Sequence, residues 1–367
     1  MAQPIERRLR VLLASTPVGP LGSGVGGGVE LTLRGIARGL LRRGHCVTVL
    51  APEGSVASAG ALVTVSGAPQ VPSQTSGRGE PVTLPPRSVL AAMWDEVRRR
   101  QPDFDVVVNL AYDWLPFYLT PFLAVPVAHL VSMGSLSEAM DSAIGAVVAA
   151  RPGAVAMHSL AQAATFPFGD RVRVLGNGID IDHYAFVPRS EPRLAWVGRI
   201  SPEKGLADAV AVAEAVDLPL HVWGLMEHEQ VWKEAVTAHP GARAVYEGFL
   251  PTDALQAGLG RCAALLLTPH WVEAFGNVAI EALACGVPVV AYARGGPAEI
   301  VADGETGFVV PPGDVAAMIA AVRRIGKIDR AAFRRLAERE YSVDALAGRV
   351  EAWLRDVVCQ SASAPRG

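Results

Sequence analysis

Two glutamates around a helix start form the most informative segment of the chain. Glu273 and Glu281 stand eight positions apart in the stretch PHWVEAFGNVAIEALACGVPVVAY. Glu273, on the loop before the helix, could hold sugar hydroxyls, and Glu281, two turns inside the helix, could accept hydrogen bonds from a ribose diol. Between them, the backbone N–H groups at the start of a helix and the helix dipole are expected to favour an anion. The residues that offer these groups are Phe275, Gly276, Asn277 and Val278.

A basic pair follows a predicted strand earlier in the same half of the chain. In WVGRISPEKG, Arg199 comes directly after the strand and Lys204 five residues later. A guanidinium and an ammonium together suit a diphosphate whose negative charge grows as the bond to it breaks. Taken alone, an arginine and a lysine after a strand are more often solvated surface charges. Two glutamates at helical spacing likewise more often face water. Their joint presence in corresponding loops favours one shared anion site.

A glycine-rich stretch near the N-terminus has three possible interpretations. Residues 22–33, GSGVGGGVELTL, contain G-x-G-x-x-G, which is typical of dinucleotide binding when it turns the chain directly out of the first strand. Here the first strand is expected to end near Ser15, well before the glycines. The favoured interpretation is that Gly27 and Gly28 precede a helix whose N-terminus approaches a phosphate or polar substrate. NAD binding and a flexible loop are the weaker alternatives.

Apolar runs and helical patterns alternate along the whole chain, which predicts an α/β protein with parallel sheets. The alternation restarts after a turn-rich join at residues 174–192. Two doubly wound domains are therefore expected, over residues 1–180 and 181–341. A last helix, about 342–358, is expected to pack back on the first domain. Residues 51–88, rich in Pro, Gly and Ser around one weak strand, are expected to form a mobile surface loop, and whether it gates a site stays open.

Composition excludes some classes of function. The 367 residues carry 33 Lys and Arg against 36 Asp and Glu, a net charge of −3, which removes the bulk attraction expected of a nucleic-acid binder. The four cysteines lack metal-type spacing, so we expect buried residues in a reducing cytoplasm. The weakly charged stretch 106–131 is interrupted by Asp113 and three prolines, so we expect two buried strands around a short helix rather than a membrane span. Oligomeric state stays open.

The combined pattern resembles the GT-B glycosyltransferases, specifically family 4, the retaining nucleotide-sugar transferases. It matches their E-x7-E signature at Glu273 and Glu281 and their G-R-x4-K signature at Gly198, Arg199 and Lys204. GNGID is similar to the hinge of the family, and GVPVVAYARGGPAEIVADGETGFVVPPGD is similar to its closing stretch. The resemblance extends over essentially the whole chain and implies the GT-B fold, with two Rossmann-like domains facing across a cleft.

This resemblance also implies roles for the residues in donor binding. Arg199 and Lys204 would bind the donor diphosphate, Glu273 the transferred sugar and Glu281 the ribose. Residues 275–278 would offer phosphate-binding amides. The end of the base-binding strand would include Phe249 and Leu250, and the Gly27–Gly28 loop would close over the diphosphate. The implied reaction is front-face hexosyl transfer with retention, without a cofactor or an obligatory metal.

The acceptor side departs from the family pattern. PVAHLVS keeps a histidine, His129, but has serine where many relatives carry a second histidine, and Tyr112-Asp113-Trp114 stands where HDW often occurs. His129 could contact the sugar or acceptor, or be a hydrogen-bonded core histidine. Asp113 could orient the acceptor or cap a helix. Tyr112, Trp114 and Phe117 could stack on a flat ring or pack in the core.

One loop adds a finer hypothesis about the substrates. STPVGPLGSGVGGGVELTL resembles cyanobacterial UDP-glucose:tetrahydrobiopterin glucosyltransferases, which would make UDP-glucose the donor and a pterin side-chain hydroxyl the acceptor. A UDP-sugar 2-epimerase on the same fold and a non-catalytic nucleotide-sugar binder remain alternatives. The sequence itself names neither the sugar nor the acceptor.

Overall fold

The computed structural model describes residues 7–56, 59–73 and 77–363. The chain divides into two compact units. The first unit comprises residues 1–178 and 343–367, and the second unit comprises residues 179–342. Residues 57–58 and 74–76 of the expected loop at 51–88 lie outside the described residues.

The first unit contains a parallel sheet with the strand order β3-β2-β1-β4-β5-β6-β7. Its central strands are buried on both faces, which explains why they read as continuous apolar runs. β3 pairs with β2 over five residues and forms an edge of the sheet. The strands are β1 (Arg10–Ala14), β2 (Cys46–Pro52), β3 (Ala61–Val65), β4 (Val106–Asn109), β5 (Val127–Leu130), β6 (Val155–Met157) and β7 (Arg173–Val174).

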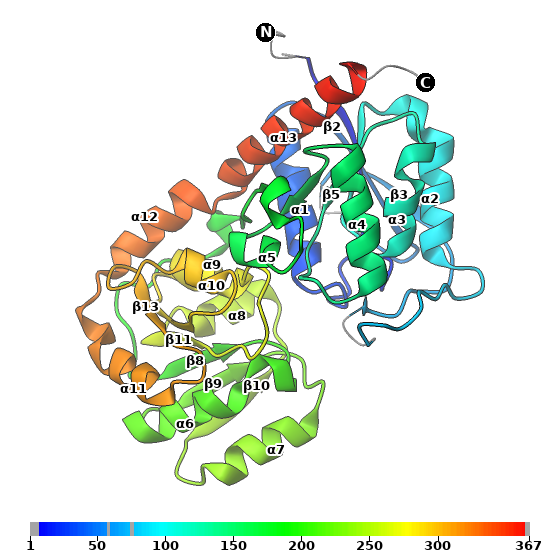
Figure 1. Cartoon of the computed structure of the whole chain (residues 1–367). Coiled ribbons are helices and arrows are strands. Elements are labelled where there is room, and N and C mark those ends of the chain that lie inside the picture. The colour runs from blue at the N-terminus through cyan, green and yellow to red at the C-terminus, as the bar shows by residue number, and fades with distance from the viewer. Residues whose placement is uncertain (1–6, 57–58, 74–76, 364–367) are drawn as a thin grey trace. The chain divides into compact units, whose positions relative to one another are not determined.

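Helices pack on this sheet. The last of them, α13, packs against α1 so closely that a Cβ added at Gly39 would lie 2.5 Å from the Cβ of Ala347 (Figure 1). α13 runs to Ser363, so the expected helix end at 358 is wrong, and no glycine or proline interrupts the extra residues. The helices are α1 (Gly28–Arg42), α2 (Val89–Arg100), α3 (Trp114–Leu119), α4 (Glu138–Ala150), α5 (Leu160–Ala163) and α13 (Val343–Ser363).

The segment expected to form two strands around a short helix does so, as β4, α3 and β5. Among the described residues, no helix combines the length and the apolarity that crossing a membrane requires.

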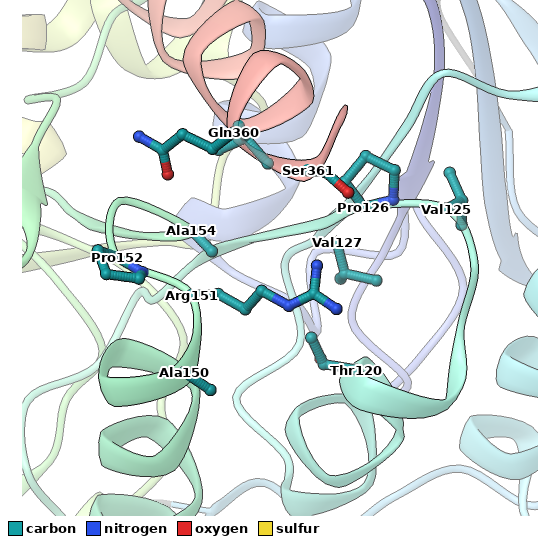
Figure 2. A pocket seen from close by; sticks show the side chains of 11 residues that line it. Thr120, Val125, Pro126, Val127, Ala150, Arg151, Pro152, Ala154, Gln360 and Ser361 are labelled. Atoms are coloured by element: carbon teal, nitrogen blue, oxygen red, sulfur yellow. The ribbon is translucent and has the colours of Figure 1, made fainter. Parts of the chain in front are cut away.

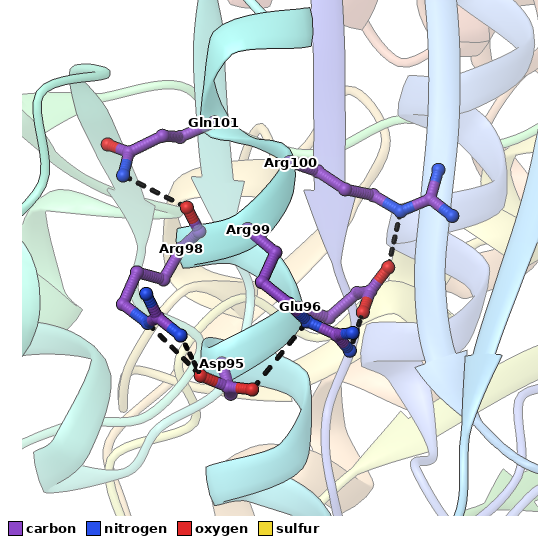
Figure 3. A network of polar contacts seen from close by, with 6 residues as sticks. All are labelled: Asp95, Glu96, Arg98, Arg99, Arg100 and Gln101. Atoms are coloured by element: carbon purple, nitrogen blue, oxygen red, sulfur yellow. Dashed lines mark hydrogen bonds and ion pairs between the residues drawn. The ribbon is translucent and has the colours of Figure 1, made fainter.

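The end of α2 carries a local network of charges. Arg98, Arg99 and Arg100 bond to Asp95 and Glu96 of the same helix (Figure 3). Cations at a helix C-terminus are favoured by the helix dipole. These charges therefore stabilise the end of α2.

The second unit contains a parallel sheet with the strand order β10-β9-β8-β11-β12-β13. Two parallel sheets with helices confirm the predicted α/β class with two doubly wound units. The strands are β8 (Leu194–Val197), β9 (Leu220–Trp223), β10 (Ala244–Gly248), β11 (Ala264–Leu267), β12 (Val289–Tyr292) and β13 (Gly307–Val310). The helices are α6 (Leu206–Val216), α7 (Glu229–Ala238), α8 (Thr252–Leu259), α9 (Asn277–Cys285), α10 (Pro297–Ile300), α11 (Val315–Arg324) and α12 (Arg330–Glu340).

The strand order of the second unit shows where a ligand is expected. From β8 the chain adds β9 and β10 on one side, then returns to add β11, β12 and β13 on the other. The order therefore reverses between β8 and β11. In open α/β sheets, ligands bind at the carboxyl ends of the strands at such a switch point. Arg199 and Lys204 follow β8, and Glu273 follows β11.

Candidate functional site

Lys204 and Glu273 meet at the switch point of the second unit. Lys204 ends a short 3-10 turn, Pro202–Lys204, just after β8, and Glu273 lies on the loop between β11 and α9. The Lys204 Nζ donates to Glu273 Oε2 at 2.5 Å, although the residues are 69 positions apart. Their side chains are only 19% and 21% exposed. The structure thus brings together two residues that the sequence predicted for one site.

Trp271 contacts both members of this pair and was not identified as a site residue from the sequence. Its Nε1 donates to the same Glu273 Oε2 at 3.1 Å, and the Lys204 Nζ lies 4.9 Å from the centre of its ring. Burial raises the pKa of Glu273, but the charge and hydrogen bond of Lys204, together with Trp271, outweigh burial and leave the pKa lowered. Glu273 is therefore held as a carboxylate beside a cation. The one feature of the sequence that could have indicated this contact is the position of Trp271, two residues before Glu273.

Arg199 is held by two carboxylates. Its Nη1 donates to Glu227 Oε2 at 2.7 Å and its Nη2 donates to Glu203 Oε1 at 3.0 Å. The Arg199 side chain is 29% exposed. Both Nη nitrogens thus already donate to anionic oxygens, the type of acceptor that a diphosphate offers. Neither glutamate was identified from the sequence.

The start of α9 lies beside Glu273. Gly276 caps α9 with φ 88°, and a Cβ there would lie 2.7 Å from the Pro297 Cγ, so glycine is required. The N–H of Gly296 donates to the Glu273 carbonyl at 2.8 Å, which fixes the backbone of the loop. The segment 275–278 therefore occupies the start of a nine-residue helix, and anion binding by its amides stays a prediction.

Glu281 is the fifth residue of α9, a little more than one turn inside the helix, so the expected two turns were an overestimate. Its side chain is buried, and Oε1 accepts a hydrogen bond of 2.8 Å from the Tyr184 hydroxyl. Burial raises the pKa of Glu281 to about 7, although the bond from Tyr184 lowers it. Tyr184 was not identified from the sequence, and binding of a ribose by Glu281 stays a prediction.

The expected base-binding residues follow β10. Phe249 is 62% exposed one residue beyond that strand, whereas Leu250 packs partly on the core. Gly198 directly follows β8, which β9 separates from β10, and its N–H donates to the Trp223 carbonyl at 3.0 Å. The exposed ring of Phe249 therefore lies at the carboxyl edge of the same sheet.

In the first unit, the glycine-rich loop folds onto a carboxylate. Gly27 caps α1 with φ 57°, and the helix begins at Gly28 rather than after it. The N–H of Gly22 donates to Glu30 Oε2 at 2.6 Å, and the N–H of Gly26 donates to Glu30 Oε1 at 2.9 Å. Glu30 is buried. Two amides of the loop thus already bind an anionic group of the chain itself.

His129 on β5 is fully buried. Its Nδ1 lies 3.1 Å from the amide nitrogen of Asn109 and its Nε2 lies 2.9 Å from the Thr120 hydroxyl. An amide nitrogen only donates, so Nδ1 accepts and Nε2 carries the proton. Burial lowers the pKa of His129 to about 3. This neutral, doubly bonded ring matches the core-histidine alternative, and Phe117 stacks on it at 4.2 Å between ring centres.

Asp113 and Tyr112 lie beyond the carboxyl end of β4. Asp113 occupies the N-cap position of α3, but its side chain makes no capping hydrogen bond. It is 9% exposed, and burial raises its pKa to about 7. The Tyr112 hydroxyl accepts from the N–H of Leu136 at 3.3 Å, and burial raises its pKa to about 12. Of the two, Asp113 has the chemistry of a proton carrier near neutral pH.

A separate cavity of about 190 Å³ lies in the first unit (Figure 2). Val127 begins β5 and Ala154 precedes β6, so the cavity is at the amino ends of these strands. It is therefore at the opposite edge of the sheet from Asp113. The side chain of Arg151 extends into this space, and Gln360 of α13 borders it. Within the described ranges, no group of three or more His, Cys, Asp or Glu could hold a metal ion.

Known proteins resemble both parts of the chain. Residues 185–343 match the family model described as Glycosyl transferases group 1. Over 143 residues the chain is 36% identical to the 2-deoxystreptamine N-acetyl-D-glucosaminyltransferase of Streptomyces fradiae, which covers 37% of this chain but only 34% of that protein. Over 363 residues it is 26% identical to the D-inositol 3-phosphate glycosyltransferase of Arthrobacter sp. (strain FB24), with 83% of each chain covered.

Solved structures share the whole fold. AviGT4, a glycosyltransferase involved in avilamycin A biosynthesis, superposes with a TM-score of 0.73 at 22% identity, over 96% of this chain and 98% of its own. Anabaena Alr3699/HepE in complex with UDP gives a TM-score of 0.74 at 18% identity, over 95% of this chain and 100% of its own. The chain thus has the GT-B fold of these structures, and its residues 185–343 match the Glycosyl transferases group 1 model.

Proposed function

We propose that the chain is a retaining glycosyltransferase that moves a hexose from a nucleotide-sugar donor to the hydroxyl of a small-molecule acceptor. The proposal rests on one observation: Lys204 and Glu273 meet at the switch point of the second unit, with Arg199 on the same strand end. A cation beside a carboxylate suits a ligand that joins a diphosphate to a sugar. The second unit would bind the donor, and the first unit the acceptor.

In this mechanism Arg199 and Lys204 stabilise the negative charge that develops on the departing diphosphate. The bond between the anomeric carbon and the diphosphate oxygen breaks, and a bond to the acceptor oxygen forms on the same face. The acceptor proton passes to the leaving phosphate. Glu273 binds hydroxyls of the transferred sugar, and the amides of residues 275–278 bind phosphate oxygens. The chain's own side chains thus position the substrates and stabilise charge, without a protein nucleophile.

The remaining donor contacts follow from position. Glu281 accepts from the ribose hydroxyls and Phe249 with Leu250 packs on the base. Gly198 lets the chain turn close to the donor, and Gly27 and Gly28, which carry no side chains, would let the backbone of their loop approach the diphosphate. UDP-glucose is the proposed donor, supported by the loop resemblance described above and by Anabaena Alr3699/HepE, which has this fold and is known in complex with UDP-glucose.

For the acceptor we propose a small molecule, with tetrahydrobiopterin as the specific candidate, in a cytoplasmic setting. Asp113 supports this role best, since burial places its pKa at about 7, where a carboxyl group can orient and share a hydroxyl proton. Tyr112 lies beside it with a buried ring. His129, neutral and bonded on both sides, would act through Asn109 and Thr120 rather than by direct proton transfer.

The test is a substrate panel read by mass spectrometry. The protein is incubated with UDP-, GDP- and ADP-sugars, with and without acceptors that include reduced pterins. Acceptor-dependent gain of a hexose supports transfer, and NMR of the product's anomeric proton shows whether the configuration is retained. Isomerisation of a UDP-sugar without acceptor would favour the epimerase instead. Glu273→Gln should abolish transfer, whereas Glu229→Gln, on the exposed face of α7, should not.

A further inference from the structure

Tyr184 connects the turn-rich join to the helix that carries Glu281. It follows the 3-10 turn Ile181–His183, and its hydroxyl donates to Glu281 Oε1 at 2.8 Å. Tyr184 and Glu281 are each only 5% exposed. A bond to a charged group at such burial is worth more than a bond at the surface. The pair is therefore a strong constraint on where the Glu281 carboxylate points.

The backbone of Tyr184 is fixed to the same helix. Arg334 of α12 donates from Nη1 to the Tyr184 carbonyl and, at 3.1 Å, to the Ala284 carbonyl of α9. The tyrosine is thus held at its carbonyl by a side chain that also holds α9, and at its hydroxyl by Glu281. Hydrogen bonds thus connect both ends of Tyr184 to α9, the helix that carries Glu281. They restrict movement of the Tyr184 hydroxyl relative to the Glu281 carboxylate.

We propose that Tyr184 is a positioning residue for donor binding: its hydroxyl fixes the orientation of the Glu281 carboxylate, which accepts a hydrogen bond from a ribose hydroxyl. This inference rests on the proposed function. A carboxylate offers about four lone-pair sites on two oxygens, so the bond from Tyr184 leaves capacity for the ribose. The Tyr184 hydroxyl supplies the donor that a buried carboxylate needs before the ligand arrives.

The buried carboxyl of Glu281 has a pKa near neutral pH. Burial raises the pKa of Cys285, one turn further along α9, to about 12, so its thiol stays neutral. Burial raises the pKa of Glu281 to about 7, and the bond from Tyr184 acts in the opposite direction. Removing the hydroxyl must therefore raise the pKa of Glu281 further. The other charged groups nearby are Asp253 of α8, which acts on Tyr184, and Arg334 and Arg330 of α12, which act on Cys285.

The first test measures Glu281 directly. Glutamate labelled with ¹³C at the side-chain carboxyl is followed by NMR against pH, and the Glu281 signal is identified by its loss in Glu281→Gln. Tyr184→Phe is expected to raise the midpoint by about one pH unit, the loss of one bond to a charged group. The matched control is Tyr292→Phe, which removes a tyrosine hydroxyl bonded to Asp208 at 2.7 Å in the same unit. It should leave the Glu281 midpoint unchanged.

The second test follows the affinity for UDP-glucose between pH 6 and pH 9 by calorimetry. Tyr184→Phe is expected to weaken binding by about fivefold near pH 7, by about tenfold near pH 6 and by little at pH 9, where Glu281 is ionised without help. A purely structural role would weaken binding equally at every pH. Unchanged NMR midpoint and pH profile in Tyr184→Phe would overturn the positioning role. A shifted midpoint with no binding of any UDP-sugar by the unaltered protein would instead refute the proposed function, and the ribose contact with it.

Discussion

Removing the ammonium of Lys204 should weaken diphosphate binding by a predictable amount. Lys204→Met keeps the length and apolar stem of the side chain but deletes the Nζ that bonds Glu273. The side chain is 19% exposed, so its contact with a bound phosphate is partly shielded from water. One bond between charged groups contributes about 1.5–3 kcal/mol. The Kd for UDP should therefore rise roughly 10- to 150-fold.

Isothermal calorimetry with UDP measures this change. Lys233→Met is the matched control, since Lys233 lies on α7 with 59% of its side chain exposed and pairs only with Glu229 among the contacts described. It should bind UDP as the unaltered protein does, and Lys204→Arg should retain most of the affinity. Thermal unfolding of each variant checks that the second unit stays folded. A Kd for Lys204→Met within about twofold of the unaltered value would show that Lys204 does not contact the diphosphate.

Three further outcomes are expected. Trp271→Phe keeps an aromatic ring but deletes the indole N–H that donates to Glu273. The kcat for transfer should therefore fall about tenfold with little change in the donor KM. Burial raises the pKa of Glu351, but hydrogen bonds, chiefly from Arg43, outweigh it and hold the pKa at about 2. Because this pKa lies below the unfolded value of about 4.5, the stabilisation is present above that pH and is lost as pH falls towards 2. Denaturant titrations of Glu351→Gln should lack that loss. Glu30→Ala removes both oxygens that accept from the two loop amides, so those amides should exchange with solvent roughly tenfold faster by NMR.

The sheets could be predicted because parallel strands buried on both faces read as uninterrupted apolar runs. VVVN became β4 and ALLL became β11, each beside a parallel neighbour. The meeting of Lys204 and Glu273 could also be anticipated, because strands of one parallel sheet bring their carboxyl ends to the same edge. Sequence order and sheet geometry together were sufficient for both.

Side-chain partners could not be predicted in the same way. The bond between Tyr184 and Glu281 joins residues 97 positions apart and depends on how the join packs against α9. Glu30 turns back onto the glycine loop instead of facing solvent from the first turn of α1. For His129 the sequence left two interpretations open, because burial and hydrogen bonding of one ring depend on the tertiary structure.

A crystal structure of the protein with UDP tests the central claim most directly. We expect the pyrophosphate oxygens within hydrogen-bonding distance of Lys204 and Arg199, beside the start of α9, and a ribose hydroxyl on the Glu281 carboxylate. Density for UDP elsewhere on the second unit, with Lys204 still bonded only to Glu273, would contradict the account.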